Sequence, residues 1–233
     1  MQAQEIINDV RRELVETIGA FWSDAELLAL LNRAEKDFVN KTRILEGKAT
    51  MQTQIGIMNY PLPSNWLSAK GVTYDDYTED ANNVTHNLRR LTPTNLEKML
   101  QERPQFRDVS DTQTFGMPQQ YFVWGREIWL DRAPNLVTTV ELWFKSKPIP
   151  LTVTTQEINI DDSLSDGLHQ FMLWKAWSKE KEFDLAQAAE AEYIRYVGEG
   201  RRFVKKQSGD QAYRLDIESG MPITGSNQNF PIR

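Results

Sequence analysis

Apolar side chains recur at helical spacing at both ends of this chain and at alternate positions in its middle. In the first block they recur at intervals of three and four residues, which predicts two amphipathic helices, over about residues 3–18 and from Ser23 toward Gly47. The two stripes are Ile7, Val10, Leu14 and Ile18, and then Leu27, Leu31, Ala34 and Phe38. Ser23 and Glu26 have the spacing of a capping box behind Trp22, and Gly47 is expected to end the second helix. The short link predicts an antiparallel pair.

The middle block alternates with a period of two, as half-buried strands do. Residues 118–134, PQQYFVWGREIWLDRAP, hold two such runs around Gly125 and Arg126, which predicts a β-hairpin. A strand is expected before the hairpin, ending at the YPLP sequence of Tyr60–Pro63, and another over Val72–Tyr77. The alternating positions of the first strand are Met51, Thr53, Ile55 and Ile57, and those of a strand after the hairpin are Val140, Leu142 and Phe144.

Two shorter segments complete the middle block. Thr92 followed by Pro93 predicts the N-cap and first residue of a short helix that carries Leu96, Met99 and Leu100. The DDYTED run over residues 75–80 predicts an exposed loop. Together with the strands, these segments predict a small antiparallel sheet or sandwich with one helix packed on it.

The last block returns to helical spacing. Asp161 and Asp162 precede a segment that is apolar on nearly every side, which predicts a helix buried on two sides. Its surplus apolar surface makes Phe171, Trp174 and Trp177 candidate subunit-interface residues. Asp184 is expected to cap a fourth helix, in which Gly198 and Gly200 permit a kink or a close neighbour. The expected stripe of that helix is Leu185, Ala189, Tyr193, Tyr196, Gly200 and Phe203.

These patterns predict an α+β fold. The two helix pairs, in residues 1–47 and 160–206, are expected to form a four-helix bundle, with residues 48–159 inserted as a β-rich domain. From residue 207 the composition shifts to Gly, Pro, Ser, Asn and Gln, so the compact fold is expected to end there.

The segment 207–233 allows two interpretations. Single apolar residues alternate with polar ones, which is typical of an extended arm that adds a strand to a partner or fills its pockets. The other interpretation is a disordered terminus. The apolar residues that would dock are Tyr213, Leu215, Ile217, Phe230 and Ile232.

Composition excludes several classes of protein. The chain has no cysteine, so disulfides, thiolate metal sites and cysteine nucleophiles are absent. Its net charge is −6 and its pI is near 5.1, which argues against nucleic-acid binding by phosphate neutralisation. We expect no signal peptide, because the N-terminal segment has no apolar core, and no membrane-spanning segment.

The residues capable of chemistry form no recognisable catalytic or metal site, so we expect neither an enzyme nor a cofactor. His86 and His169 have no Asp or Ser at a spacing that marks a triad, and surface or capping roles are expected for both. The carboxylates of Asp75, Asp76, Glu79 and Asp80 lack the glycine and the bidentate Glu of an EF-hand. The carboxylates of Asp161, Asp162 and Asp166 fit the start of a helix, where the helix dipole stabilises negative charge.

A basic cluster ends the fourth helix: Arg201, Arg202, Lys205 and Lys206. These cations complement the helix dipole there, and as an alternative they dock on an acidic partner or contact phosphates transiently. The seven Trp residues fall mostly on core-facing positions, which favours packing over stacking on sugar or single-stranded nucleic acid.

Over residues 1–206 the chain resembles the head-to-tail adaptor (neck or connector ring) proteins of tailed bacteriophages, particularly short-tailed ones. The resemblance is carried by the order of WSDAELL (22–28), YPLPSNWL (60–67), the 118–134 hairpin and the Trp-rich and Ala-rich helices of 164–204. It implies a structural virion protein of the neck, assembled in the host cytoplasm.

The resemblance also implies partners. Such adaptors sit as homo-oligomeric rings, usually of twelve copies, under the portal protein and join it to the next tail or nozzle component. Genomic DNA would pass through the bore without specific binding, and no membrane is involved. The alternative function that the residues leave open is a soluble carbohydrate- or protein-binding accessory module, suggested by the Trp-rich sheet.

Overall fold

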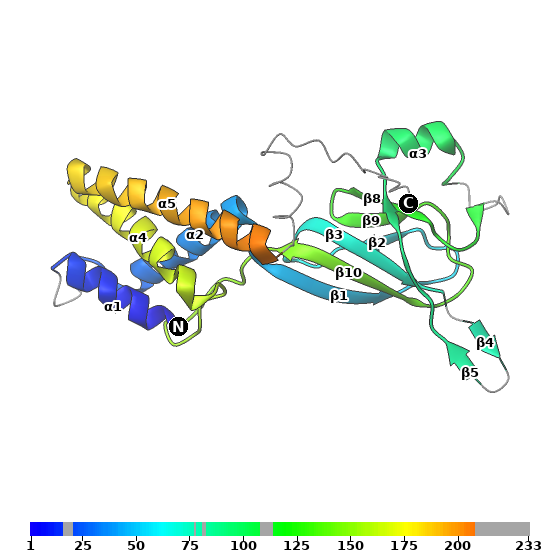
Figure 1. The fold of residues 1–233 in the computed structure, drawn as a ribbon, viewed down its shortest axis with the longest axis horizontal. Helices are drawn as coiled ribbons and strands as arrows, with labels where there is room; N and C mark the ends of the chain where they lie inside the picture. The colour runs from blue at the N-terminus through cyan, green and yellow to red at the C-terminus, as the bar shows by residue number, and fades with distance from the viewer. Residues whose placement is uncertain (16–20, 77, 81–82, 108–113, 208–233) are drawn as a thin grey trace, which may run out of the picture. The chain divides into compact units, whose positions relative to one another are not determined.

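The chain divides into a helical unit and a β unit (Figure 1). The computed structural model describes residues 1–15, 21–76, 78–80, 83–107 and 114–207. The helical unit combines Met1–Ile44 with the segment from Pro150 onward, and the β unit is Leu45–Ile149. The class is therefore α+β, as the hydrophobic patterns predicted.

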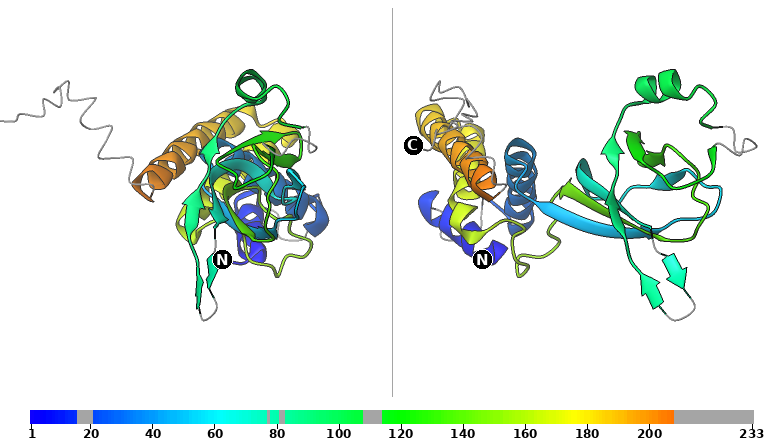
Figure 2. Two further views of the ribbon diagram at one scale, coloured as in Figure 1. Left: turned by 90° about the vertical axis from the view of Figure 1, so that its right-hand side faces the viewer. Right: turned by 45° about the vertical axis from the view of Figure 1, so that its right-hand side comes forward.

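Both ends of the chain contribute helices to the helical unit. Its elements in the described residues are α1 (Ala3–Glu13), α2 (Asp24–Thr42), the short 3-10 helix η2 (Asp162–Leu164), α4 (Ser165–Glu180) and α5 (Phe183–Gln207). The helices α4 and α5 lie side by side, joined by a short turn, and both contact α2 (Figures 1 and 2). Helix α1 contacts α2 and α4.

The first two helices begin where the sequence predicts, but both end earlier, α1 at Glu13 and α2 at Thr42. The Ser23 side chain accepts a hydrogen bond from the Glu26 amide, and the predicted stripe of α2 is fully buried. Arg43, in the left-handed conformation with φ 57°, then terminates the helix. The prediction that Gly47 ends it was wrong, because Gly47 is a strand residue against the Phe144 ring, where a Cβ would lie 2.8 Å from ring carbons. Ile18 lies outside the described residues.

Helix α5 buries a stripe rotated from the predicted one. Its buried positions are Ala186, Ala189, Tyr193, Val197 and Gly200. Leu185, predicted to be buried, is 48% exposed, because the small Ala186 side chain faces the other helices instead. The helix runs unbroken through Gly198 and Gly200, so neither glycine kinks it.

The segment that returns from the β unit is fixed to α2 by side-chain clamps. The Asn32 side chain exchanges two hydrogen bonds with the Leu151 backbone, at 2.9 and 2.7 Å. The Glu35 carboxylate accepts hydrogen bonds from the Asn159 amide and from its side chain, at 2.7 and 2.9 Å. Because Glu35 is fully buried, desolvation raises its pKa, and the bonds from Asn159 offset only part of that rise.

The β unit contains two four-stranded sheets. The first has the order β1-β10-β3-β6 and is antiparallel; the second, β2-β9-β8-β7, is mixed, since β7 runs parallel to β8. A separate hairpin of β4 and β5 projects from them (Figures 1 and 2). The bounds are β1 (Glu46–Gln52), β2 (Asn59–Pro61), β3 (Trp66–Asp75), β4 (Thr78–Asp80), β5 (Asn83–Thr85), β6 (Leu88–Arg90), β7 (Thr92–Pro93), α3 (Leu96–Glu102), β8 (Gln120–Trp124), β9 (Glu127–Leu130) and β10 (Thr139–Ser146).

The two sheets share one core, and α3 covers the other face of the second sheet. The shared core takes Val72, Leu142 and Phe144 from the first sheet and Tyr121 and Ile128 from the second. Met99 of α3 packs instead with Phe122 and Phe106. Adjacent residues of β8, Tyr121 and Phe122, therefore face opposite sides and are both only 4% exposed.

Several predictions for the middle block were wrong in detail. The chain turns at Gly56, with φ 80°, so Ile55 and Ile57 leave the first strand and are exposed. A strand does end within the YPLP sequence, at Pro61, but it is the separate short strand β2 paired with β9, since the first strand ends at Gln52.

Strand pairing also displaces the predicted helix start and loop. Thr92 and Pro93 form β7, and the short helix begins later, with Asn95 accepting a hydrogen bond from the Lys98 amide. The predicted loop over residues 75–80 contains the paired strand β4, and Asp75 at its start is buried. For Thr92 and Pro93, pairing with the distant strand β8 outweighs the local sequence signal, whereas β4 pairs with its sequence neighbour β5 in a local hairpin.

Candidate docking surfaces

The described residues contain no group of three or more His, Asp or Glu side chains placed to hold a metal ion. Asp161 accepts hydrogen bonds from the Ser163 amide and hydroxyl at 2.9 and 2.6 Å, and these bonds lower its pKa. The predicted capping role therefore holds for Asp161, which caps η2, whereas α4 itself has no side-chain cap. Asp162 accepts from the Met1 ammonium at 2.6 Å.

Each histidine lies beside one carboxylate. His86, which is exposed and lies between β5 and β6, places Nδ1 2.6 Å from Oδ2 of Asp75 at the end of β3, a contact that the sequence spacing does not reveal. His169 Nε2 lies 3.6 Å from Glu13 Oε1. The predicted surface role fits His86, whereas His169 is largely buried, with 15% of its side chain exposed.

The aromatic helix α4 packs its rings around Tyr193 of α5. Phe171 meets Tyr193 edge-on at 5.2 Å between ring centroids, and Trp174 stacks on it at 6.2 Å. Burial and the hydrogen bond to Asp37 raise the pKa of the Tyr193 hydroxyl. Phe171 is only 6% exposed, so it belongs mainly to the core of its own subunit, while Trp174 and Trp177 stay half-buried.

The outer surface of α5 exposes more apolar area than α4 does. Phe183 is 69% exposed and Ile194 is 61% exposed. Because eleven residues separate them, they lie on one side of the helix with Glu190 between them. The apolar pattern of the sequence did not reveal this surface, because it predicts a single stripe that includes Leu185 and Phe203.

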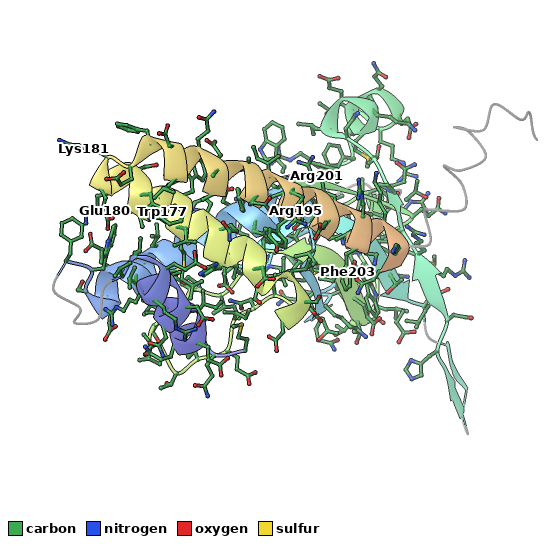
Figure 3. All side chains as sticks on the ribbon, turned by 60° about the vertical axis from the view of Figure 1, so that its left-hand side comes forward. Trp177, Glu180, Lys181, Arg195, Arg201 and Phe203 are labelled. Atoms are coloured by element: carbon green, nitrogen blue, oxygen red, sulfur yellow. The ribbon has the colours of Figure 1, made fainter. Side chains whose placement is uncertain are left out.

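The basic cluster lies on the last turns of α5. Its four side chains, those of Arg201, Arg202, Lys205 and Lys206, are exposed. Arg201 Nε donates a hydrogen bond of 3.0 Å to the Lys41 carbonyl near the end of α2, so Arg201 helps to satisfy that helix terminus. Figure 3 shows Arg195, Arg201 and Phe203 along α5, and Trp177, Glu180 and Lys181 at the opposite end, where α4 meets the turn.

Two tryptophans of the β unit are exposed. Trp124 stands beside the hairpin turn and is 61% exposed. Trp143 lies on the outer face of the first sheet with the Lys48 ammonium 4.7 Å from its ring centroid. The apolar arm residues, Tyr213, Leu215, Ile217, Phe230 and Ile232, lie outside the described residues.

No helix in the described part of the chain has both the length and the hydropathy to cross a membrane. A family model described as "SU10 adaptor protein" matches residues 1–217, which is nearly the whole sequence. No curated protein matches the chain.

Proposed function

The chain belongs to the SU10 adaptor protein family, a family of phage head-to-tail adaptors, and from this premise we propose that it forms an oligomeric ring under the portal. The ring joins the capsid to the next tail or nozzle component and continues the DNA channel. The match over residues 1–217 carries the proposal.

The exposed surface of the helical unit supports assembly. Phe183 and Ile194 of α5 are large apolar side chains that one subunit leaves in water, and Trp174 and Trp177 keep part of their surface free. Burying apolar surface stabilises association by about 25 cal/mol per Å². A closed ring of identical subunits needs two different complementary surfaces on each copy. We propose twelve copies, matching the portal.

The basic end of α5 and the C-terminal arm are the proposed docking elements for the portal or a neighbouring subunit. Arg202 and Lys206 are exposed on the last turns of α5, which ends at Gln207. Exposed cations such as these orient the chain toward an acidic partner and increase the rate of association with it. Because the chain as a whole is acidic, DNA in the bore would meet mostly like charge and move freely.

The test is assembly in solution and on the portal. Size-exclusion chromatography with light scattering, followed by negative-stain imaging, is expected to give rings when the chain is mixed with portal protein of the same phage. A chain that remains monomeric with and without portal would contradict the proposal.

Charge reversal tests whether the basic cluster at the end of α5 is needed for portal binding. The variant with Glu at positions 201, 202, 205 and 206 is expected to lose portal binding. A second variant keeps Arg201, because this residue bonds to Lys41, and changes only the other three. If both variants fold and still bind the portal, the cluster has no docking role.

The exposed tryptophans favour one alternative, a carbohydrate- or protein-binding module. Trp143 under the Lys48 ammonium resembles the flat aromatic platforms on which sugars stack. A glycan array probed with the wild type and with Trp143→Ala tests it: glycan binding that Trp143→Ala abolishes, by a chain that ignores the portal, would favour this function.

A further inference from the structure

A groove between α2 and α4 combines an apolar floor with cations at its rim. It has a volume of about 330 Å³, and its lining includes Trp22, Glu26, Leu30, Arg33, Phe171, Lys175 and Lys179. We call it the α2–α4 groove. Phe171, Lys175 and Lys179 recur every four residues and so form one ridge of α4, while Leu30 and Arg33 are neighbours on one face of α2.

The floor and the rim differ in chemistry. Trp22, Leu30 and Phe171 are at most 8% exposed, so the floor is already packed and presents only a shallow apolar surface. Lys175 places its ammonium 3.3 Å from the centroid of the Trp174 ring. Among the described residues, neither Arg33 nor Lys175 forms an ion pair with a carboxylate, although the chain carries an excess of acidic residues. Lys179, the third cation of the rim, already pairs with Glu26, a carboxylate that also lines the groove. Within the described residues, Arg33 and Lys175 are therefore the two rim cations without a carboxylate partner.

The chain itself carries a surface of the matching kind. On α5, Phe183, Glu190 and Ile194 lie along one side of the helix, and we call them the α5 ridge. Phe183 and Ile194 are more than half exposed, and the Glu190 carboxylate between them forms no ion pair with any described residue. At 1.5 Å per residue the ridge spans about 16 Å, against about 12 Å for the α4 side of the groove.

From this complementarity we infer that the α2–α4 groove of one copy receives the α5 ridge of the next copy. Apolar side chains of the ridge cover the floor, and Glu190 pairs with Arg33 and Lys175 at the rim. The two surfaces differ, so the contact is heterologous and propagates around a ring instead of closing a dimer. The inference rests on the proposed ring and assigns the two surfaces that build it.

Engineered cysteines test the contact directly, since the chain has no cysteine of its own. Ala29 is an exposed residue of the groove wall, and Ile194 lies on the ridge. Under oxidation, with and without portal, the double variant Ala29→Cys with Ile194→Cys is expected to give a ladder of covalent oligomers. A mixture of the two single variants should give only dimers, and each single variant alone should give none. A chain that assembles without forming the ladder would overturn the inference while leaving the proposed ring intact.

A charge swap provides a second measurement with a matched control. Arg33→Glu is expected to weaken self-association about tenfold or more, because it sets like charges together. Lys36→Glu makes the same charge change at an exposed position of the same helix outside the groove, and it should leave association unchanged. Adding Glu190→Arg to Arg33→Glu should restore association.

The remaining outcomes count against the inference. If Arg33→Glu abolishes portal binding but leaves self-association intact, the groove receives the portal. If the wild type never self-associates, with or without portal, both the inference and the proposed ring fail. If the swap with Glu190→Arg gives no rescue although both variants keep the wild-type circular dichroism spectrum, Glu190 is not the partner of the groove.

Discussion

Two glycines of α5 that lie two residues apart have opposite surroundings. A Cβ added to Gly200 would lie 2.9 Å from Thr42 Cγ2 and 3.0 Å from Phe38 Cζ, whereas one added to Gly198 would meet nothing within 4 Å. In a helix interior, Ala is favoured over Gly by about 0.5–1 kcal/mol. We therefore expect Gly198→Ala to raise the free energy of unfolding by about that amount.

Gly200→Ala should have the opposite effect, since overpacking a core costs about 1–3 kcal/mol and outweighs the same helix preference. Urea unfolding of the two variants, followed by tryptophan fluorescence, measures the difference. Equal stability of the two variants would show that Phe38 moves aside without cost.

Glu35 gives a pH dependence at the residue scale. Burial raises its pKa in the folded chain above the unfolded value of about 4.3. The folded chain therefore binds this proton more tightly, and the Glu35 contribution to stability falls as pH rises from the unfolded to the folded pKa. Urea unfolding at a series of pH values should show that the free energy of unfolding of Glu35→Gln lacks this decrease with pH. A stability difference between wild type and Glu35→Gln that stays constant with pH would contradict the assignment.

At the scale of elements, the β8–β9 hairpin depends on one backbone conformation. Gly125 has φ 63°, with open space where a Cβ would lie. We expect Gly125→Val to destabilise the chain by about 1–2 kcal/mol through backbone strain alone. Gly125→Asn should cost much less, because Asn tolerates the left-handed region. Thermal unfolding compares the two, and similar losses for Val and Asn would argue against strain.

At the scale of the whole molecule, the described core ends with α5 at Gln207, whereas the family match extends ten residues further. If residues 208–233 serve as a docking arm, a chain ending at Gln207 should keep the wild-type Tm but lose portal binding. Differential scanning calorimetry and a portal pull-down measure the two properties. Unchanged portal binding would remove the arm from the proposed function, and a lower Tm would show that the arm packs on its own subunit.

Much of the fold follows from local patterns. The α2 start at Ser23, the Gly125 turn and the buried residues of β10 were predicted correctly, because capping, left-handed glycine and period-two alternation act over a few residues. The candidate docking surfaces were harder to predict from the sequence. The exposed basic residues at the end of α5 follow from the sequence. Phe171 of α4, which the sequence suggested as an interface residue, is instead largely buried in its own subunit.

The sequence by itself determined the α+β class, the family and most element positions, since these depend on periodicity and on the order of motifs. Only the tertiary structure decided which side of α5 is buried, that Thr92 and Pro93 join a strand, and that Asp75 meets His86. Each of these depends on a partner distant in sequence, and the free energy of packing and pairing with that partner exceeds the local preference.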